Sequence, residues 1–225
     1  LQAFDDLLAL PDNEFWDLIN SPKKMKKDTA LATETANAML DAITLDLASL
    51  HTAYSATGTN EVTGGSPAYA RKAITMAAAA ARARANSTSP VFDVPAGTVA
   101  FVGLWTNAGT VFRGMFANGG SEKGFQVDLT NDKILCESHG LSNDDRVVFY
   151  GGTPPTGLAE GTLYYVVSST AADPDTFQVA STQGGSAINL TGQHTASCKL
   201  SKVIPETFGA QGTFTVTTLT LGLTE

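Results

Sequence analysis

Short apolar runs with a period of two constrain this chain more than any other feature of its sequence. From residue 46 onward the apolar side chains follow the spacing of β-strands. Val99–Trp105 is apolar on both faces, which is typical of a central strand covered on each side. The tripeptide Asn107-Ala108-Gly109 has hairpin length and precedes a second strand at 111–116. The sequence therefore predicts a mainly β, antiparallel sandwich.

Two other segments have patterns that do not fit a single regular strand. Ile74–Asn86 contains an alanine run with strong helix propensity, but its flanks alternate as a strand does, and we predict a strand that passes into a loop. Thr213–Leu221 alternates at first, and its apolar phase then jumps. This jump predicts one C-terminal strand with a bulge at Thr217 or Thr218.

The helical signal is confined to the beginning of the chain. Asp28 is placed to cap a helix. An apolar face at i, i+4 spacing is predicted for Leu31, Thr35, Met39 and Ile43, with Ala36 and Leu40 beside it.

Residues 1–27 form a segment that we call the N-terminal arm. It combines short helical, apolar stretches with a lysine-rich run at 23–27, which is either a solvated linker or an electrostatic clasp. Its apolar segments are too short to be stable alone, so they must pack on something. We expect the arm to dock on a neighbouring subunit through Phe4, Leu7, Leu8, Phe15, Trp16 and Ile19.

The sign of the net charge changes along the chain at the same places as the spacing of the apolar residues. Residues 1–46 carry 9 acidic and 4 basic side chains, residues 47–127 carry 3 and 6, residues 128–203 carry 8 and 4, and residues 204–225 carry 2 and 0. The four net charges are thus −5, +3, −4 and −2. Sign changes of this kind mark candidate module edges.

Residues 128–203 are predicted to be a separate small β module inserted into a helix and β-sandwich core, which comprises residues 28–127 plus 204–225. The lone strand after the module needs a sheet to join, so the entry and exit strands of the module should lie side by side. The predicted strands of the module are 134–137, 146–150, 163–168, 176–180, 187–190 and 197–203.

Composition excludes two classes of partner. Charged residues make up 16% of the chain and the net charge is −8, which argues against a nucleic-acid-coating role. No apolar run has the length of about 18 residues that a membrane-spanning helix needs, so we expect no membrane insertion.

Candidates for chemistry are poor, and we expect no catalytic residue, cofactor or metal ion. The three histidines lie outside any metal-ligand spacing: His139 is predicted to be a turn residue, and His51 to be packed or paired in a strand. Asp144 and Asp145 are neighbours in a predicted turn and make a poor pair for glycan hydrolysis. No phosphate-loop, dinucleotide or Gly-x-Ser-x-Gly pattern occurs.

The two cysteines leave two alternatives open. Cys136 and Cys198 are either semi-buried thiols or a cross-strand disulfide that joins the ends of the inserted module.

Several stretches resemble proteins of bacteriophage virions. Residues 36–42, 49–53, 60–71, 92–99 and 102–105 resemble minor tail or tail-fibre-adaptor proteins of tailed phages. Residues 138–147, 161–167 and 176–180 are similar to a small β module that recurs in phage tail and fibre proteins. The resemblance implies a structural role and brings no catalytic residues with it.

We therefore expect a non-enzymatic virion protein that assembles as a homo-oligomer with other virion subunits in the tail tip, baseplate or fibre-attachment region. One alternative is a capsid decoration protein. Another is an adhesin that binds host-surface glycan, with Tyr150, Tyr164 and Tyr165 of the module stacked on sugar rings. The same tyrosines are otherwise the core of the module.

Overall fold

A computed structural model describes residues 29–106 and 108–222. In this part of the chain the fold is mainly β, and the paired strands of its sheets are all antiparallel, as predicted. The chain divides into two compact units. Of the described residues, 29–44, 75–88 and 218–222 belong to unit 1, and 45–74, 89–106 and 108–217 belong to unit 2.

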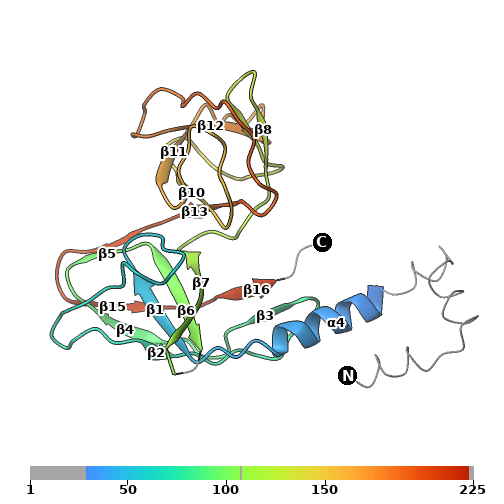
Figure 1. Ribbon diagram of the computed structural model, residues 1–225. Helices are drawn as coiled ribbons and strands as arrows, with labels where there is room; N and C mark the ends of the chain where they lie inside the picture. Colours follow the sequence, from blue (N-terminus) through green and yellow to red (C-terminus); the bar gives the residue numbers. More distant parts are fainter. Residues whose placement is uncertain (1–28, 107, 223–225) are drawn as a thin grey trace, which may run out of the picture. The chain divides into compact units, whose positions relative to one another are not determined.

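A four-stranded sheet in unit 2 has the order β2-β1-β6-β7 (Figure 1). Its strands are β2 (Lys72–Ala73), β1 (Leu47–His51), β6 (Phe101–Thr106) and β7 (Val111–Ala117). Every residue of β6 is buried, which confirms the prediction of a central strand covered on both faces. The predicted hairpin is also present, because β6 and β7 pair from Phe101 and Ala117 to their shared turn.

Two short strand pairs are each formed by one segment that precedes β6 and one that follows β13 in the sequence. Strand β4 (Val91–Val94) pairs with β15 (Gly212–Thr215), and β5 (Gly97–Val99) pairs with β14 (Glu206–Phe208). Both pairings join segments more than a hundred residues apart, so the chain after residue 203 returns to the segment that precedes β6.

A six-stranded sheet is built from a continuous stretch of unit 2 and has the order β13-β10-β11-β12-β9-β8. The bounds of β10 and β12 are as predicted. Strand β8 was not predicted, and the strand predicted at 187–190 is wrong, since Ile188 only donates its N–H to the Val179 carbonyl there. The strands are β8 (Gln126–Asp128), β9 (Lys133–Leu135), β10 (Arg146–Tyr150), β11 (Leu163–Val167), β12 (Thr176–Ala180) and β13 (Lys199–Val203).

The segments that enter and leave the six-stranded sheet lie side by side. Ile204 N donates to the Asn118 carbonyl at 2.7 Å, and Asn118 Nδ2 returns a bond of 2.8 Å to the Ile204 carbonyl. Lys123 forms a further antiparallel bridge with Leu200. The chain therefore leaves the first part of unit 2 and re-enters it at one place.

One hydrophobic cluster joins the four-stranded and the six-stranded sheet of unit 2. From the six-stranded sheet it takes Val148, Tyr150 and Val203, and these pack with residues before and along β6 and β7. A second, larger cluster lies on the other face of the six-stranded sheet and includes Phe149, Phe177 and both cysteines. The sheet therefore buries both of its faces over part of its area. The partners in the first cluster are Ala100, Phe101, Met115 and Ala117.

In unit 1 the helix α4 (Thr29–Asp41) lies against β3 (Ala83–Ala85), which pairs with β16 (Thr220–Gly222) (Figure 1). Two polar side chains of the helix hold the neighbouring loop. Asn37 Oδ1 accepts from Arg82 N and Asp41 Oδ1 accepts from Ala79 N, both at 2.8 Å. The helix is therefore anchored to this loop by one side of its surface.

The predicted apolar face of the helix is wrong, as the burial of its side chains shows. Ala36 and Leu40 are buried, whereas Met39 is 59% exposed and Ile43 is 41% exposed. Because residues 37 and 41 face the loop, the adjacent pair at 36 and 40 is turned inward, and Met39 is turned outward.

The C-terminal segment also differs from its prediction. The single strand expected at 213–221 is two strands, β15 in unit 2 and β16 in unit 1. The apolar phase jump at Thr217 and Thr218 marks the passage of the chain between the units rather than a bulge. Residues 74–86 contain no helix, as predicted. Their strand, β3, comes at the end of the segment, after a turn in which Ala81 and Arg82 adopt positive φ, so the order of strand and loop is the reverse of the predicted one.

Candidate functional site

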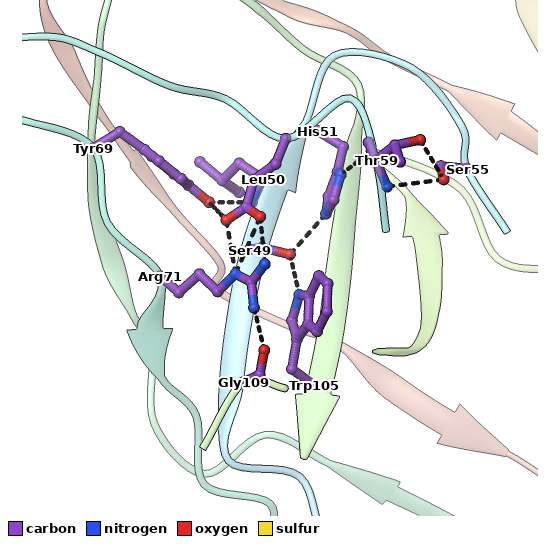
Figure 2. A network of polar contacts seen from close by, with 10 residues as sticks. Ser49, Leu50, His51, Ser55, Thr59, Tyr69, Arg71, Trp105 and Gly109 are labelled. Carbon is purple, nitrogen blue, oxygen red and sulfur yellow. Dashed lines mark hydrogen bonds and ion pairs between the residues drawn. The ribbon is translucent and has the colours of Figure 1, made fainter. Parts of the chain in front are cut away.

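The best-defined polar cluster of the described chain surrounds Ser49 in strand β1 (Figure 2). Ser49 and His51 are two residues apart on one strand, so their side chains share a face of the sheet. The register sets Ser49 opposite Gly103 of β6, and Trp105 follows two residues later on the same face. The pairing of β1 with β6 therefore brings three polar side chains together inside the sheet.

These three side chains form a linear chain of hydrogen bonds, which ends at the Thr59 carbonyl (Figure 2). His51 Nδ1 lies 2.8 Å from the Thr59 carbonyl, which can only accept, so we assign the ring proton to Nδ1. His51 Nε2 then accepts from Ser49 Oγ at 2.7 Å, and Ser49 Oγ accepts from Trp105 Nε1 at 2.7 Å. Every polar atom of the three side chains has a partner.

Burial keeps this histidine neutral. His51 and Ser49 are both 0% exposed. Burial is the main cause that lowers the pKa of His51 below its ordinary value of 6.5, and the positive charge of Arg71 lowers it further. The bond to Thr59 and the charge of Glu61 act in the opposite direction but do not reverse the shift.

A charged layer lies beside the buried chain. Arg71 binds Glu61 through Nε at 2.9 Å and through Nη2 at 2.7 Å, and its Nη1 donates to the Gly109 carbonyl. The guanidinium carbon lies 3.5 Å from the centre of the Trp105 ring, which is a cation–π contact. Arg71 therefore ties together the β6–β7 turn, the tryptophan and a carboxylate.

Tyr69 connects this layer to the backbone of strand β1. Its hydroxyl accepts from Leu50 N at 2.7 Å and donates to Glu61 Oε1 at 3.2 Å. Burial raises the pKa of Tyr69 far above its ordinary value, so the phenol stays protonated and serves as a fixed donor. The network thus spans the segments at 49–51, 59–71 and 105–109.

Two glycines let the backbone close over the network. A Cβ on Gly103 would lie 2.5 Å from His51 Nε2 and 2.6 Å from Ser49 Oγ. A Cβ on Gly58, whose φ is +81°, would lie 2.6 Å from the Trp105 ring. Larger residues at either position would therefore occupy the space that these side chains fill.

The arrangement favours a structural tie over catalysis. A serine within hydrogen-bond reach of a histidine is the beginning of a nucleophile and base pair. Here the histidine is held by a backbone carbonyl, the serine oxygen already accepts from Trp105, and neither side chain is exposed. A substrate carbonyl has no approach to the serine oxygen in this state, and the bonds instead lock β1 to β6.

The three tyrosines considered for glycan contact occupy different environments. Tyr150 and Tyr164 are buried, and their hydroxyls bond Ser201 Oγ and Ala159 N. They belong to hydrophobic clusters, so neither offers a ring face to a sugar. Only Tyr165 is partly exposed, and its ring centre lies 5.7 Å from the guanidinium carbon of Arg146.

Cys136 and Cys198 are both free and buried in one hydrophobic cluster. The structure thus has two separate thiols in place of the cross-strand disulfide that was one alternative. Burial raises the pKa of both thiols, for Cys198 to about 11, which keeps them protonated and unreactive at neutral pH.

Three other polar residues that the sequence singles out accept hydrogen bonds from backbone N–H groups. His139 accepts from Leu141 N at 2.9 Å, as expected of a turn residue. Asp145 accepts from Ser142 N, which fits its predicted turn role, whereas Asp144 accepts from Gly184 N of a distant segment. Among the described residues, no group of three or more His, Cys, Asp and Glu side chains is placed to hold a metal ion.

Sequence reasoning found His51 but missed its partners. Glu61, Tyr69 and Arg71 come from one segment, at 59–71, and Trp105 comes from another. No local pattern links either segment to Ser49 and His51. One signal was present, since two polar residues, Ser49 and His51, interrupt an otherwise apolar strand at the spacing that shares one face.

The predicted contacts of the N-terminal arm lie outside the described residues. Within the described part of the chain, no helix has the length and apolar character needed to span a membrane. No protein-family model, curated protein or solved structure matches this chain.

Proposed function

We propose that this chain is a non-enzymatic structural protein of a tailed bacteriophage virion, assembling in the tail tip, baseplate or fibre-attachment region through its N-terminal arm. One observation carries the proposal. The segments that resemble minor tail and tail-fibre-adaptor proteins, at 49–53, 60–71 and 102–105, supply Ser49, His51, Glu61, Tyr69, Arg71 and Trp105. The resemblance thus falls on the residues that hold the sheet together.

We also propose the finer architecture that the strand and charge patterns of the sequence predict. The four-stranded sheet and the pairs β4–β15 and β5–β14 are the components of an antiparallel sandwich, and residues 128–203 are its inserted module. The side-by-side bonds between Asn118 and Ile204 support an insertion, because they bring the two ends of the module together.

A structural role also agrees with the chemistry of the polar cluster. Its serine and histidine are enclosed, and its charged pair is engaged with Trp105 and a turn carbonyl. Such a network specifies one arrangement of strands, which suits a protein that must present fixed surfaces to neighbouring subunits.

Imaging of labelled particles tests the proposal. Phage particles carrying this chain with an epitope tag are labelled with gold-conjugated antibody and viewed by negative-stain electron microscopy. We expect gold at the distal end of the tail. Gold over the head would support the capsid decoration alternative, and particles without label, beside tagged protein in the unassembled fraction, would refute a virion role.

The adhesin alternative now depends on Tyr165. With Tyr150 and Tyr164 buried, Tyr165 beside Arg146 is the aromatic group of the three that a sugar ring can reach. A glycan array in which wild-type protein gives signals that Tyr165→Ala abolishes and Tyr165→Phe keeps would favour this function. An array without signals would remove it.

A further inference from the structure

Unit 1 has little hydrophobic core in its described part. Its buried apolar side chains there are Ala36, Leu40 and Leu219. Small domains are normally supported by a disulfide, a metal ion or association with another chain. Both cysteines lie in unit 2, and the described residues hold no metal-binding group. The described part of unit 1 therefore calls for further apolar contacts.

The helix of unit 1 presents the surface that such contacts need. We define the α4 face as Thr35 and Met39, which are one turn apart on the helix, together with Ile43, which follows just after the helix ends at Asp41. All three side chains are exposed. Met39, at 59%, and Ile43, at 41%, are two of the large apolar side chains that the protein exposes. Arg84 lies at one end of this face, because its Nη1 donates to the carbonyls of Leu40 and Ile43.

The N-terminal arm has the complementary chemistry. Residues 1–20 contain five carboxylates and no lysine or arginine, together with the apolar side chains named above as the arm's contacts. An acidic, apolar segment matches an apolar face that is edged by an arginine. The arm, residues 1–27, is joined through Asp28 to α4, which begins at Thr29, so the helix that carries this face follows the arm directly in the chain.

We infer that the α4 face is the acceptor surface for the N-terminal arm of a neighbouring copy of this chain. The apolar side chains of the arm cover Met39 and Ile43, and its carboxylates lie beside Arg84. This rests on the proposed function, in which the arm assembles the subunits, and it adds the surface that receives the arm. Each copy then donates one arm and accepts another, a heterologous contact that forms a closed ring when its rotation closes.

Oligomer mass tests the acceptor surface. Full-length protein is measured by light scattering after size exclusion, and the wild type is expected at a multiple of the 23.4 kDa chain. The double variant Met39→Gln/Ile43→Gln should weaken association at least about tenfold, because apolar contact is replaced by polar groups that need water. Glu34→Gln, an exposed change on the same helix but off the α4 face, should keep the wild-type mass.

Crosslinking distinguishes a neighbouring arm from the chain's own arm. The linker at 21–28 spans up to about 26 Å, and α4 is about 18 Å long from Thr29 to Asp41, so both arrangements are within reach. A Trp16→Cys chain is therefore mixed with a differently tagged Ile43→Cys chain and oxidised. We expect a disulfide-linked species that carries both tags. As a control, the second chain carries Val91→Cys in place of Ile43→Cys. Val91 is exposed but lies in unit 2, so we expect no species that carries both tags.

The outcomes separate this inference from the proposed function. A monomeric wild type, or a bridge that forms only within a chain bearing both cysteines, would overturn docking between copies. If Phe15→Ser/Trp16→Ser dissociates the oligomer while Met39→Gln/Ile43→Gln does not, the acceptor surface is wrong and arm-driven assembly stands. If the Phe15 and Trp16 changes leave the mass unaltered, arm-driven assembly itself fails.

Discussion

Ser49 is the residue on which the buried network depends most directly. It accepts from Trp105 Nε1 and donates to His51 Nε2, and no other described group bonds either atom. Ser49→Ala would leave both of these buried atoms unpaired. The cost is the desolvation of two groups, so we expect the free energy of unfolding to fall by about 3 kcal/mol.

Urea denaturation measures that loss. The matched control is Thr52→Ala, in which an exposed hydroxyl one residue beyond β1 loses a long bond of 3.3 Å to the Asn60 carbonyl. This control should change stability by less than about 0.5 kcal/mol. An equal effect of the two substitutions would mean that the Ser49 bonds contribute nothing particular.

The pH dependence of stability should report His51. Its pKa is lowered in the folded state by burial first, and the unfolded state keeps the ordinary value of 6.5. Below 6.5 the unfolded chain therefore binds a proton that the folded protein does not, and stability is lost as pH falls from about 7 toward the lowered pKa. Burial shifts the pKa of His194 in the same direction.

Thermal unfolding between pH 8 and 5.5 checks this sign while the carboxylates stay ionised. We expect the melting temperature of the wild type to fall toward pH 5.5. The curve should be flatter for His51→Gln and flatter again for His51→Gln/His194→Gln. A wild-type curve that rises toward low pH would contradict a buried, neutral imidazole.

At the scale of strands, the close approach of β1 and β6 depends on Gly103. The register sets it opposite Ser49, and a Cβ would come within 2.6 Å of both polar side chains beside it. Gly103→Ala should therefore push the two strands apart or break the Ser49–His51 bond, at a cost of about 2–4 kcal/mol. The measurement is again the free energy of unfolding.

Gly124→Ala is the control for that substitution. Its added Cβ would have no atom within 4 Å, and its backbone is not in the left-handed region, so we expect stability within about 0.5 kcal/mol of the wild type. Equal losses at the two glycines would show that the space beside Ser49 does not explain the effect, because the entropy of the unfolded chain by itself makes Gly→Ala stabilising.

Elements with a strong local pattern could be predicted from the sequence, and the others could not. Strands β6, β10 and β12 have apolar runs or alternation between clear turns, and each was found. The face of α4 was wrong because its orientation is set by bonds from Asn37 and Asp41 to a loop some 40 residues later in the sequence. The apolar periodicity of the helix alone favoured Met39 and Ile43, which the tertiary contacts leave exposed.

At the scale of the whole molecule, the sequence pattern locates the point where the chain passes from one unit to the other, but it does not show that two units are involved. The phase jump at Thr217 and Thr218 was interpreted as a bulge, yet the chain passes there from one compact unit to the other. Alternation along a strand reports only which faces are buried and says nothing of which sheet buries them. For the same reason the sequence does not predict the cluster that joins the four-stranded and the six-stranded sheet.

That cluster decides what happens when the inserted segment is removed. Replacing residues 128–203 by a short Gly-Ser bridge keeps Asn118 and Ile204 within bonding distance, but it removes Val148, Tyr150 and Val203 from Phe101 and Met115. We expect a folded product that is less stable by about 2–4 kcal/mol from the newly exposed side chains. In a Trp16→Phe background, Trp105 should keep its buried fluorescence and unfold cooperatively. A red-shifted Trp105 without a cooperative transition would show that residues 128–203 are part of the core and cannot be separated from it.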